Sequence, residues 1–268
     1  MKIKIAVTGY KGRLGQRLVA LGALPLDCDV LDVASVDNAI KSMSPDVIIH
    51  AAAKSGVDFC QNNYNKAFDV NAYGTNNVSV TASGYNAKIL YLSSEQVFSG
   101  VWGKYKETNK IKPKNTYGLT KQLGESLAGL WGGKTLRLSR GVSRTDTDID
   151  GVLDCMKNDK EKITVPSFFY RNYQHVDFLS EQIWWCANRF DILPSILHVG
   201  GSEYLSWHDF VTRLAKADGY NGKIAKRKVD RKEFAPRPHR CGFNLSLARS
   251  IGVPMYKVQT TIERLLSE

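Results

Sequence analysis

The feature that most constrains the fold is the alternation, over the first 140 residues, of short apolar runs with segments of helical periodicity. Continuous apolar runs such as VIIHAAA (47–53) are typical of strands buried on both faces of a parallel sheet. We predict strands at residues 2–7, 24–31, 47–53, 88–94 and 134–138, separated by helices at 13–20, 36–43, 64–83 and 116–130. This alternation predicts an α/β fold with a doubly wound parallel sheet.

A glycine-rich segment, TGYKGRLG, follows the first strand directly and places Gly9, Gly12 and Gly15 between a strand and a helix. Glycines at such a turn let backbone N–H groups and the helix N-terminus approach a pyrophosphate closely. The first gap is one residue longer than in the usual G-x-G-x-x-G pattern, and a purely structural turn is the alternative. Because of the strand–turn–helix context, we predict a dinucleotide site and a Rossmann-like fold.

The pattern becomes irregular past about residue 140, which predicts a change of organisation there. We expect a loop at 143–150, helices at 181–189 and 207–217, and a strand at 196–201. Ligands of doubly wound folds lie beyond the carboxyl ends of the strands. We therefore predict an NAD(P)-binding Rossmann domain over residues 1–145, with 175–200 packing back onto it, and a smaller substrate-binding lobe formed mainly by 146–268.

Tyr117 and Lys121 form the single Y-x-x-x-K pair in the sequence, and they follow Ser94 at the end of a predicted strand. Residues four apart share one face of a helix. An ammonium group beside a phenol favours the tyrosinate, which makes the phenol a usable proton donor near neutral pH. The spacing alone arises often by chance, so its position after Ser94 gives it weight.

The chain carries 37 Lys+Arg against 26 Asp+Glu, a formal net charge of +11, which suggests an anionic partner. Ten of these excess charges lie in two windows, 104–114 and 223–240. Neither window has the interleaved aromatic residues or the groove-reading helix of a nucleic-acid binder. We therefore expect a small phosphorylated ligand rather than nucleic acid, and ordinary solvated basic loops are the alternative.

The cysteines predict reduced thiols in a cytoplasmic protein, because the five are scattered and include no C-x-x-C pair. The apolar run at the N-terminus is shorter than a signal-peptide core, and no stretch is long enough to span a bilayer. The five histidines show no H-x-x-x-H spacing, so we expect no metal site. A membrane partner is likewise not expected.

Taken in order, TGYKGRLG, VIIHAAA, the Asn71 region DVNAYGTNN, LYLSSEQVFSG and YGLTK resemble the extended short-chain dehydrogenase/reductase family. Within it, PDVIIHAAAKSGVD followed by SSEQVFSG is most similar to the dTDP-4-dehydrorhamnose reductases. The resemblance spans almost the whole chain and is strongest up to about residue 140. It implies NAD(P)H-dependent reduction of a 4-keto-6-deoxy sugar nucleotide.

The resemblance also implies roles for individual residues. Tyr117 would donate a proton to the carbonyl oxygen, Ser94 would hydrogen-bond that oxygen beside Glu95, and Lys121 would bind the nicotinamide ribose. The implied cofactor contacts are Gly9, Lys11, Gly12, Arg13 and Leu14 at the pyrophosphate and adenosine side, Asp29 and Val30 at the adenine, and Ala51 and Ala52 behind the cofactor, with Tyr117 and Lys121.

Two arginines, Arg171 in RNYQHVD and Arg237 in APRPHR, lie in stretches that resemble diphosphate-binding elements of sugar-nucleotide enzymes. Guanidinium groups can grip a diphosphate, so both are candidates for the substrate site, and surface or structural ion pairs are the alternative. Sugar-nucleotide dehydratases carry an acidic residue where this chain has Gln96. Since an amide cannot act as that acid, a dehydratase is disfavoured.

Several alternatives remain open on the sequence alone. Asp29 or Asp32 could hold the adenosine ribose of NADH, whereas Lys11, Arg13 and Arg17 could take the 2′-phosphate of NADPH, which we slightly favour. The same site with bound NAD⁺ could run epimerisation of a nucleotide sugar. A non-catalytic, cofactor-binding regulatory subunit is a third reading. By analogy with the family, the helices at 64–83 and 116–130 would form the face of a homodimer.

Overall fold

A computed structural model describes residues 3–227 and 235–268, and its centre is a six-stranded sheet in the order β10-β5-β4-β3-β1-β2. All neighbouring strands in it are parallel. The order reverses at β1, so β2 and β3 flank it, as in a doubly wound fold. The strands are β1 (Ile5–Thr8), β2 (Leu24–Pro25), β3 (Val47–His50), β4 (Lys88–Ser94), β5 (Lys134–Leu138) and β10 (Ile196–Val199). The predicted fold class is confirmed.

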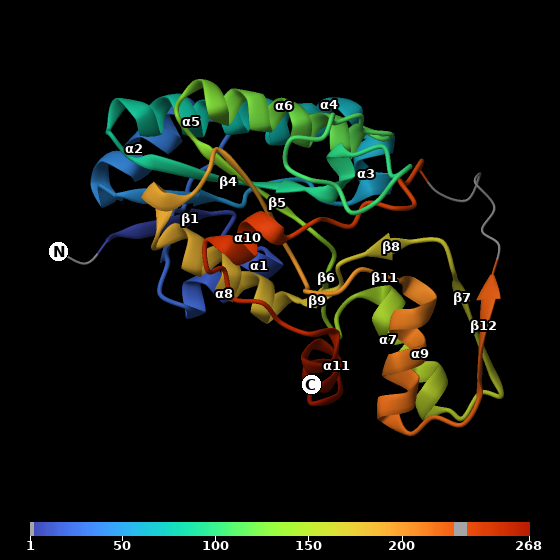
Figure 1. The fold of residues 1–268 in the computed structure, drawn as a ribbon. Helices are drawn as coiled ribbons and strands as arrows, with labels where there is room; N and C mark the ends of the chain where they lie inside the picture. Colours follow the sequence, from blue (N-terminus) through green and yellow to red (C-terminus); the bar gives the residue numbers. More distant parts are fainter. Residues whose placement is uncertain (1–2, 228–234) are drawn as a thin grey trace.

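Helices cover both faces of this sheet (Figure 1). One face carries α1 (Arg13–Ala20), α8 (Val176–Ala187) and α10 (Ser246–Ser250), and the other α2 (Val33–Met43), α5 (Gly74–Gly84) and α6 (Thr116–Leu130). Successive strand residues point to opposite faces. Ile5 and Val7 of β1 therefore enter the core under α1 and α8, whereas Ala6 enters the core under α2 and α5.

Several predicted elements coincide with the structure, and others differ for local reasons. The segments 13–20, 88–94, 116–130 and 134–138 match α1, β4, α6 and β5. The run 24–31 yields only the two-residue β2. The helix expected at 64–83 comprises α4 (Tyr64–Phe68), a π-helical turn η1 (Asp69–Tyr73) and α5, with α3 (Val57–Asn62) before it.

The loop expected at 143–150 instead contains the start of α7 (Thr147–Lys157). Its polar residues are helix-initiation signals, since Asp148 and Asp150 lie in the first turn, where negative charge is favourable. Similarly, α8 begins five residues before the predicted 181, because the His175 side chain accepts a hydrogen bond from the Asp177 N–H and caps it.

A smaller lobe packs below the sheet around its own apolar core (Figure 1). Its elements are α7, α9 (Trp207–Asp218), α11 (Val258–Leu266) and the parallel pair β7 (Lys162–Pro166) and β12 (Lys223–Arg227). Two short pairs join it to the sheet, β6 (Gly141–Val142) with β9 (Gln174–His175), and β8 (Tyr170–Arg171) with β11 (Leu205–Ser206). The chain then returns to the sheet through α8, the turn η3 (Phe190–Ile192) and β10.

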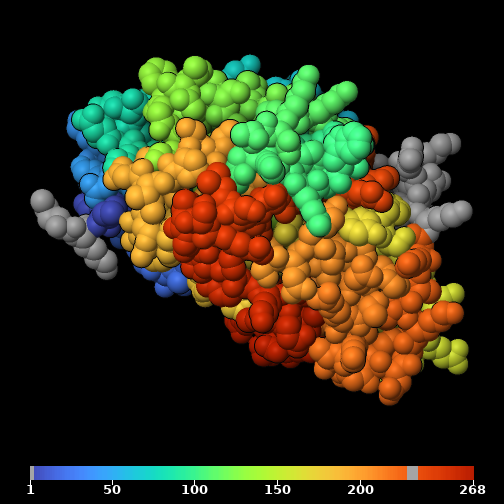
Figure 2. Space-filling model, viewed as in Figure 1, coloured from blue at the N-terminus to red at the C-terminus, as the bar shows by residue number. Residues whose placement is uncertain are grey.

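The segment after residue 234 crosses the front of the molecule next to the loop between β4 and α6 (Figure 2). The Arg240 N–H donates to the Gly100 carbonyl at 3.0 Å, and Tyr105 and Phe243 form a β-bridge. The basic window 104–114 therefore lies against this segment. Part of the other window, residues 228–234, falls outside the described residues.

Among the described residues, no helix has the length and apolarity needed to cross a bilayer. The five cysteines are unpaired thiols, and Cys60, Cys186 and Cys241 among them are buried.

Candidate functional site

The turn between β1 and α1 is shaped to receive an anion. Gly9 has a φ of +64°, and a Cβ there would lie 2.7 Å from the Ala52 backbone. A Cβ on Gly15 would lie 2.3 Å from the Gly9 carbonyl oxygen. The helix starts after Gly12 with no side-chain cap and no acidic residue in its first turn, so its N–H groups remain available for a phosphate. The residues present therefore fit the pyrophosphate of a dinucleotide.

A network of buried hydrogen bonds holds the end of β3 behind the glycine turn. His50 lies between Thr8, at 2.8 Å from Nδ1, and Thr75, at 3.1 Å from Nε2. The Thr8 hydroxyl also accepts the Ala52 N–H at 3.2 Å. Burial, reinforced by the Lys121 charge, lowers the pKa of His50 to about 3, so the imidazole is neutral. The network fixes Ala52 and its neighbour Ala51 behind the glycine turn.

Asn71 ties the sheet to the helix that carries the candidate catalytic residues. It lies in the π-helical turn η1 and is fully buried. Its side chain accepts the Lys54 N–H at 2.7 Å, and donates to the Lys54 carbonyl and to the Thr120 hydroxyl, both at 3.0 Å. Single π-turns inside helices are frequent at functional sites. The motif DVNAYGTNN pointed to Asn71 without indicating this bracing role.

Ser94 and Tyr117 meet where β4 ends and α6 begins. Asn115 caps α6 by accepting the Gly118 N–H at 2.8 Å, which starts the helix just before Tyr117. Burial raises the pKa of Tyr117 to about 12, while a hydrogen bond with the Ser94 side chain acts in the opposite direction. The Ser94 oxygen also accepts the Gln96 N–H at 3.2 Å. The structure thus brings together two of the predicted catalytic groups.

Lys121 lies one turn further along α6 and is 2% exposed. Burial lowers the pKa of its ammonium to about 7, against the opposing charges of Glu125 and Cys60. Its Nζ lies 4.1 Å from the centre of the Tyr91 ring. The expectation that the lysine charge lowers the tyrosine pKa is wrong, because burial dominates and raises the pKa of Tyr117.

Glu95 and Arg171 form an ion pair that connects the turn after Ser94 to the β8 segment beside the lobe. Both are at least nine-tenths buried, and Ser139 donates a hydrogen bond to the other Glu95 oxygen at 2.8 Å. The remaining Arg171 donors go to the carbonyl oxygens of Tyr170, Pro238 and His239. In this arrangement groups of the protein accept most of the Arg171 N–H donors, which are therefore not directed at a diphosphate. Burial raises the pKa of Glu95, and the Arg171 charge opposes the shift.

Arg237 forms a two-pronged ion pair with Asp58 of α3. This contact lowers the pKa of the Asp58 carboxyl. Next to it, the Pro236 carbonyl accepts a hydrogen bond from Asn115 at 2.8 Å, which places this segment beside the start of α6. Arg237 therefore lies in the segment that contacts the start of α6, and its guanidinium forms an ion pair with Asp58.

The remaining predicted cofactor residues are spread around the glycine turn. Asp29 accepts the Leu31 N–H at 2.9 Å, so its carboxylate is used locally. Val30 is buried against the position of Gly74 on α5. Leu14 is half-buried against the core under α1, and the exposed Lys11 lies over the Tyr10 ring. Arg13 pairs with Asp146 and reaches the Ser143 hydroxyl of the lobe side at 3.4 Å.

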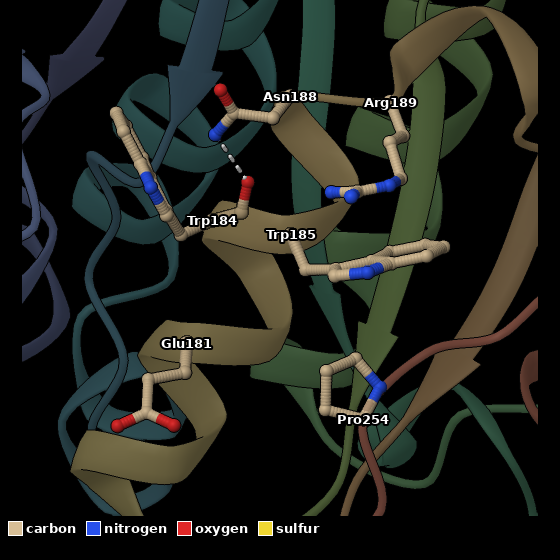
Figure 3. A pocket seen from close by; sticks show the side chains of 6 residues that line it. All are labelled: Glu181, Trp184, Trp185, Asn188, Arg189 and Pro254. Atoms are coloured by element: carbon tan, nitrogen blue, oxygen red, sulfur yellow. Dashed lines mark hydrogen bonds between the residues drawn. The ribbon is translucent and has the colours of Figure 1, made fainter.

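Two other features of the described residues lie away from this constellation. A shallow pocket on α8 is lined by Glu181, Trp184, Trp185, Asn188, Arg189 and Pro254 (Figure 3). It is remote from the carboxyl ends of the strands, where the glycine turn and Tyr117 lie. His175, Asp177 and Glu268 come within metal-binding distance of one another, but Asp177 already pairs with Arg17 and Arg264. Those two positive charges disfavour a cation there.

Comparison with known proteins identifies the family. Residues 2–268 match the family described as the RmlD substrate binding domain. The spore coat polysaccharide biosynthesis protein SpsK of Bacillus subtilis is 24% identical over 92% of this chain and 90% of its own. A dTDP-4-dehydrorhamnose reductase of Aggregatibacter actinomycetemcomitans is 37% identical over 46% of each chain. Methionine adenosyltransferase 2 subunit beta of Bos taurus is 25% identical over 84% of this chain and 70% of its own.

A crystal structure of dTDP-4-dehydrorhamnose reductase from Bacillus anthracis in complex with NADP has the same fold. It superposes with a TM-score of 0.88 at 24% identity, covering 100% of this chain and 99% of its own. The expected NAD(P)-dependent oxidoreductase family is thereby confirmed. From the whole-length match, we conclude that the chain belongs to the RmlD family within the extended short-chain dehydrogenases/reductases.

Proposed function

We propose that this protein reduces the keto group of a 4-keto-6-deoxy sugar nucleotide with NADPH or NADH. The observation that carries the proposal is the meeting of Ser94 and Tyr117 at the carboxyl end of β4, with Lys121 one turn away on α6. Both this site and the glycine turn after β1 lie at the carboxyl edge of the parallel sheet. On this proposal residues 1–145 hold the cofactor and residues 146–268 mainly bind the substrate.

Tyr117 would donate the proton that the carbonyl oxygen gains on reduction. Its pKa of about 12 keeps the phenol protonated at neutral pH, so it acts as an acid rather than as a base. The Ser94 oxygen accepts the Gln96 N–H, which leaves the serine hydroxyl hydrogen for Tyr117 or for the substrate oxygen. Lys121 would supply positive charge beside the phenol and hold the nicotinamide ribose.

A bound dinucleotide supplies hydride chemistry that the side chains of this protein cannot. The N–H groups at the start of α1 and the glycine turn would hold its pyrophosphate, with Ala51 and Ala52 behind it. Glu95 and Arg171 would hold Ser94 in position, because their ion pair fixes the turn that directly follows β4. Arg237 would approach a substrate diphosphate only by leaving or sharing Asp58.

The test is the Tyr117→Phe variant, assayed with dTDP-linked 4-keto-6-deoxy sugars and either reduced dinucleotide. We expect kcat to fall by a factor of roughly 10² to 10⁴, the usual contribution of a positioned acid. Tyr220→Phe is the matched control, since the Tyr220 hydroxyl bonds only to the Lys160 carbonyl among the described contacts, within the lobe, and it should leave turnover unchanged.

The same variants separate the reductase from a regulatory subunit. A regulatory protein would show no turnover with any nucleotide sugar, and Tyr117→Phe would leave its partner binding intact. An epimerase would purify with retained dinucleotide and interconvert sugars without net oxidation of it. Either outcome would overturn the proposed reduction.

We further propose a homodimer formed through the outer faces of α5 and α6. These helices and the turns next to them expose large apolar side chains, among them Tyr73, Leu119, Leu123 and Leu130. Burying such residues against a second copy is favourable. Light scattering of the purified chain tests this directly, and a monomeric mass at assay concentrations would contradict it.

A further inference from the structure

A carboxylate that the sequence patterns did not single out stands beside the glycine turn. The edge strand β2 pairs in parallel with β1, and Val7 lies opposite Pro25. The Leu26 N–H still donates to the Val7 carbonyl at 2.9 Å, so the pairing continues past the end of β2. Following this register, Asp27 comes level with Gly9, where the chain turns towards α1.

This position has a known meaning in dinucleotide-binding sheets. An acidic side chain about 20 residues after the glycine motif, at the end of the second strand, receives the hydroxyl groups of the adenosine ribose. Asp27 is exposed and extends from this strand end. Asp29 instead satisfies the Leu31 N–H, and Asp32 caps α2 by accepting the Ala34 N–H at 3.0 Å. The carboxylates of Asp29 and Asp32 therefore each accept a hydrogen bond from a nearby backbone N–H.

The charges around the end of β2 also favour Asp27 as the ribose-binding carboxylate. The Asp27 charge contributes to raising the pKa of Lys11, after the larger effect of Tyr10. It also adds to the effect of burial, which raises the pKa of the neighbouring Cys28 thiol to about 11, as does Asp29. Asp27 therefore contributes negative charge at the end of β2.

Two of the three cations that could neutralise a 2′-phosphate form ion pairs away from this edge. Arg13 pairs with Asp146, and Arg17 pairs with Asp177 at the start of α8. Both contacts lie on the side of α1 that faces α8 and the lobe. The third basic residue, Lys11, lies near Asp27, and the charge of that carboxylate acts on it.

We propose that Asp27 accepts hydrogen bonds from the adenosine ribose hydroxyls and makes this protein prefer NADH to NADPH. The inference rests on the dinucleotide site of the proposed function. A carboxylate can accept bonds from both vicinal hydroxyls, whereas a 2′-phosphate would bring close to two further negative charges against it. A like-charge contact of this kind discriminates strongly between two ligands.

The experiment is equilibrium titration of the full chain with NADH and with NADPH, followed by nicotinamide fluorescence. We expect NADH to bind at least about tenfold more tightly. Asp27→Asn should reduce this ratio to within about threefold, because the amide keeps the size but removes the charge. Asp32→Asn makes the same chemical change at a capping position and should leave the ratio unaltered.

Each result decides the inference independently of turnover. Tighter binding of NADPH by the unaltered chain, or an Asp27→Asn variant with an unchanged ratio, would overturn it. If Asp27→Asn lowers the melting temperature, Asp27→Ser and the ratio at a lower temperature separate folding from recognition. A chain that prefers NADH but reduces no keto sugar would contradict the proposed reaction and leave Asp27 in its role, whereas binding of neither dinucleotide would remove both.

Discussion

Two buried glutamate–arginine pairs lie side by side in this molecule and differ in what they join. Glu125 of α6 grips Arg137 of β5 through two hydrogen bonds of 2.9 and 2.8 Å, and Ser93 donates to the same carboxylate at 2.5 Å. Glu95 pairs with Arg171 and receives Ser139. Each carboxylate is thus held by one arginine and one serine, and both pairs are nearly inaccessible to water.

The difference is that the first pair joins two elements of the sheet layer, whereas the second joins the end of β4 to the β8 segment beside the lobe. Glu125 and Arg137 are 12 residues apart and join a helix to its neighbouring strand. Glu95 follows β4, whereas Arg171 belongs to β8, and its other donors reach the carbonyls of residues 238 and 239. The first pair therefore serves the stability of the sheet, and the second makes the geometry at Ser94 depend on the lobe.

Glu125→Gln should produce the largest loss of stability. It leaves the buried Arg137 charge without its carboxylate, and breaking such a pair costs about 3–5 kcal/mol. Urea unfolding of the purified variant measures this free energy. The double variant Glu125→Met/Arg137→Leu should recover most of the loss, because it buries no charge, and a double variant as unstable as the single one would contradict the interpretation.

Glu95→Gln should be less destabilising and more damaging to catalysis. The Arg171 guanidinium keeps three backbone carbonyl partners, so we expect a loss of about 1–3 kcal/mol. Because the pair fixes the turn after Ser94, kcat should fall while the Kd for dinucleotide stays unchanged. A Glu95→Gln variant with unchanged kcat, assayed well below its melting temperature, would show that the contrast between the two pairs is wrong.

Lys121 is a third buried charge, and it makes no ion pair with any carboxylate in the described part of the chain. Its pKa of about 7 lies below the ordinary 10.5, so the unfolded chain binds the extra proton between these values. Stability should therefore rise as the pH increases from about 7 to about 10.5. Lys121→Met should be more stable than the unaltered chain by about 1–2 kcal/mol at pH 7, since the lost contact with Tyr91 offsets part of the gain.

Measuring urea unfolding of both proteins at pH 7 and near pH 9.5 checks the sign. The advantage of Lys121→Met should shrink at the higher pH, where more of the Lys121 ammonium has lost its proton. An advantage that grows with pH would show that burial does not lower the pKa of Lys121.

The smallest effect is expected at the ion pair between Arg13 of α1 and Asp146, which precedes α7 of the lobe. Arg13 is 39% exposed beside Asp146, so Asp146→Asn should change the free energy of unfolding by at most about 1 kcal/mol. Thermal unfolding measures it, with Lys88→Met as a control in an exposed pair with Asp191. A larger loss would show that α1 and the lobe are coupled as strongly as Glu95 and Arg171 are.

Local patterns predicted the sheet strands and the helices that flank them well. β4 and β5 are continuous buried runs, and α6 begins where Asn115 can cap it, so their limits can be read from neighbouring residues. The edge strand β2 could not be sized in this way, because Leu26 and Val30 of the apolar run 24–31 are buried in the core without extending the strand. The place of Asp27 became visible only once that short strand was located.

The arginines show why the substrate site was harder to predict. The residues next to an arginine in the sequence do not show whether its guanidinium binds a diphosphate or a carboxylate of the same protein. The partner of Arg237 lies 179 residues away at Asp58, and that of Arg171 lies in a different element. Such pairings are set by the tertiary fold and leave no periodic trace.

The position of β10 late in the sequence has a consequence for folding during synthesis. β10 pairs with β5 and closes that side of the sheet, yet it follows the lobe elements α7, β7 and β8 in the sequence. A nascent chain that has emerged only as far as β5 carries an unpaired, largely apolar strand edge, the kind of surface on which chains join one another. We expect the growing polypeptide to be most prone to aggregation between the emergence of Leu138 and that of Ile196, and to lose this hazard when the edge strand docks.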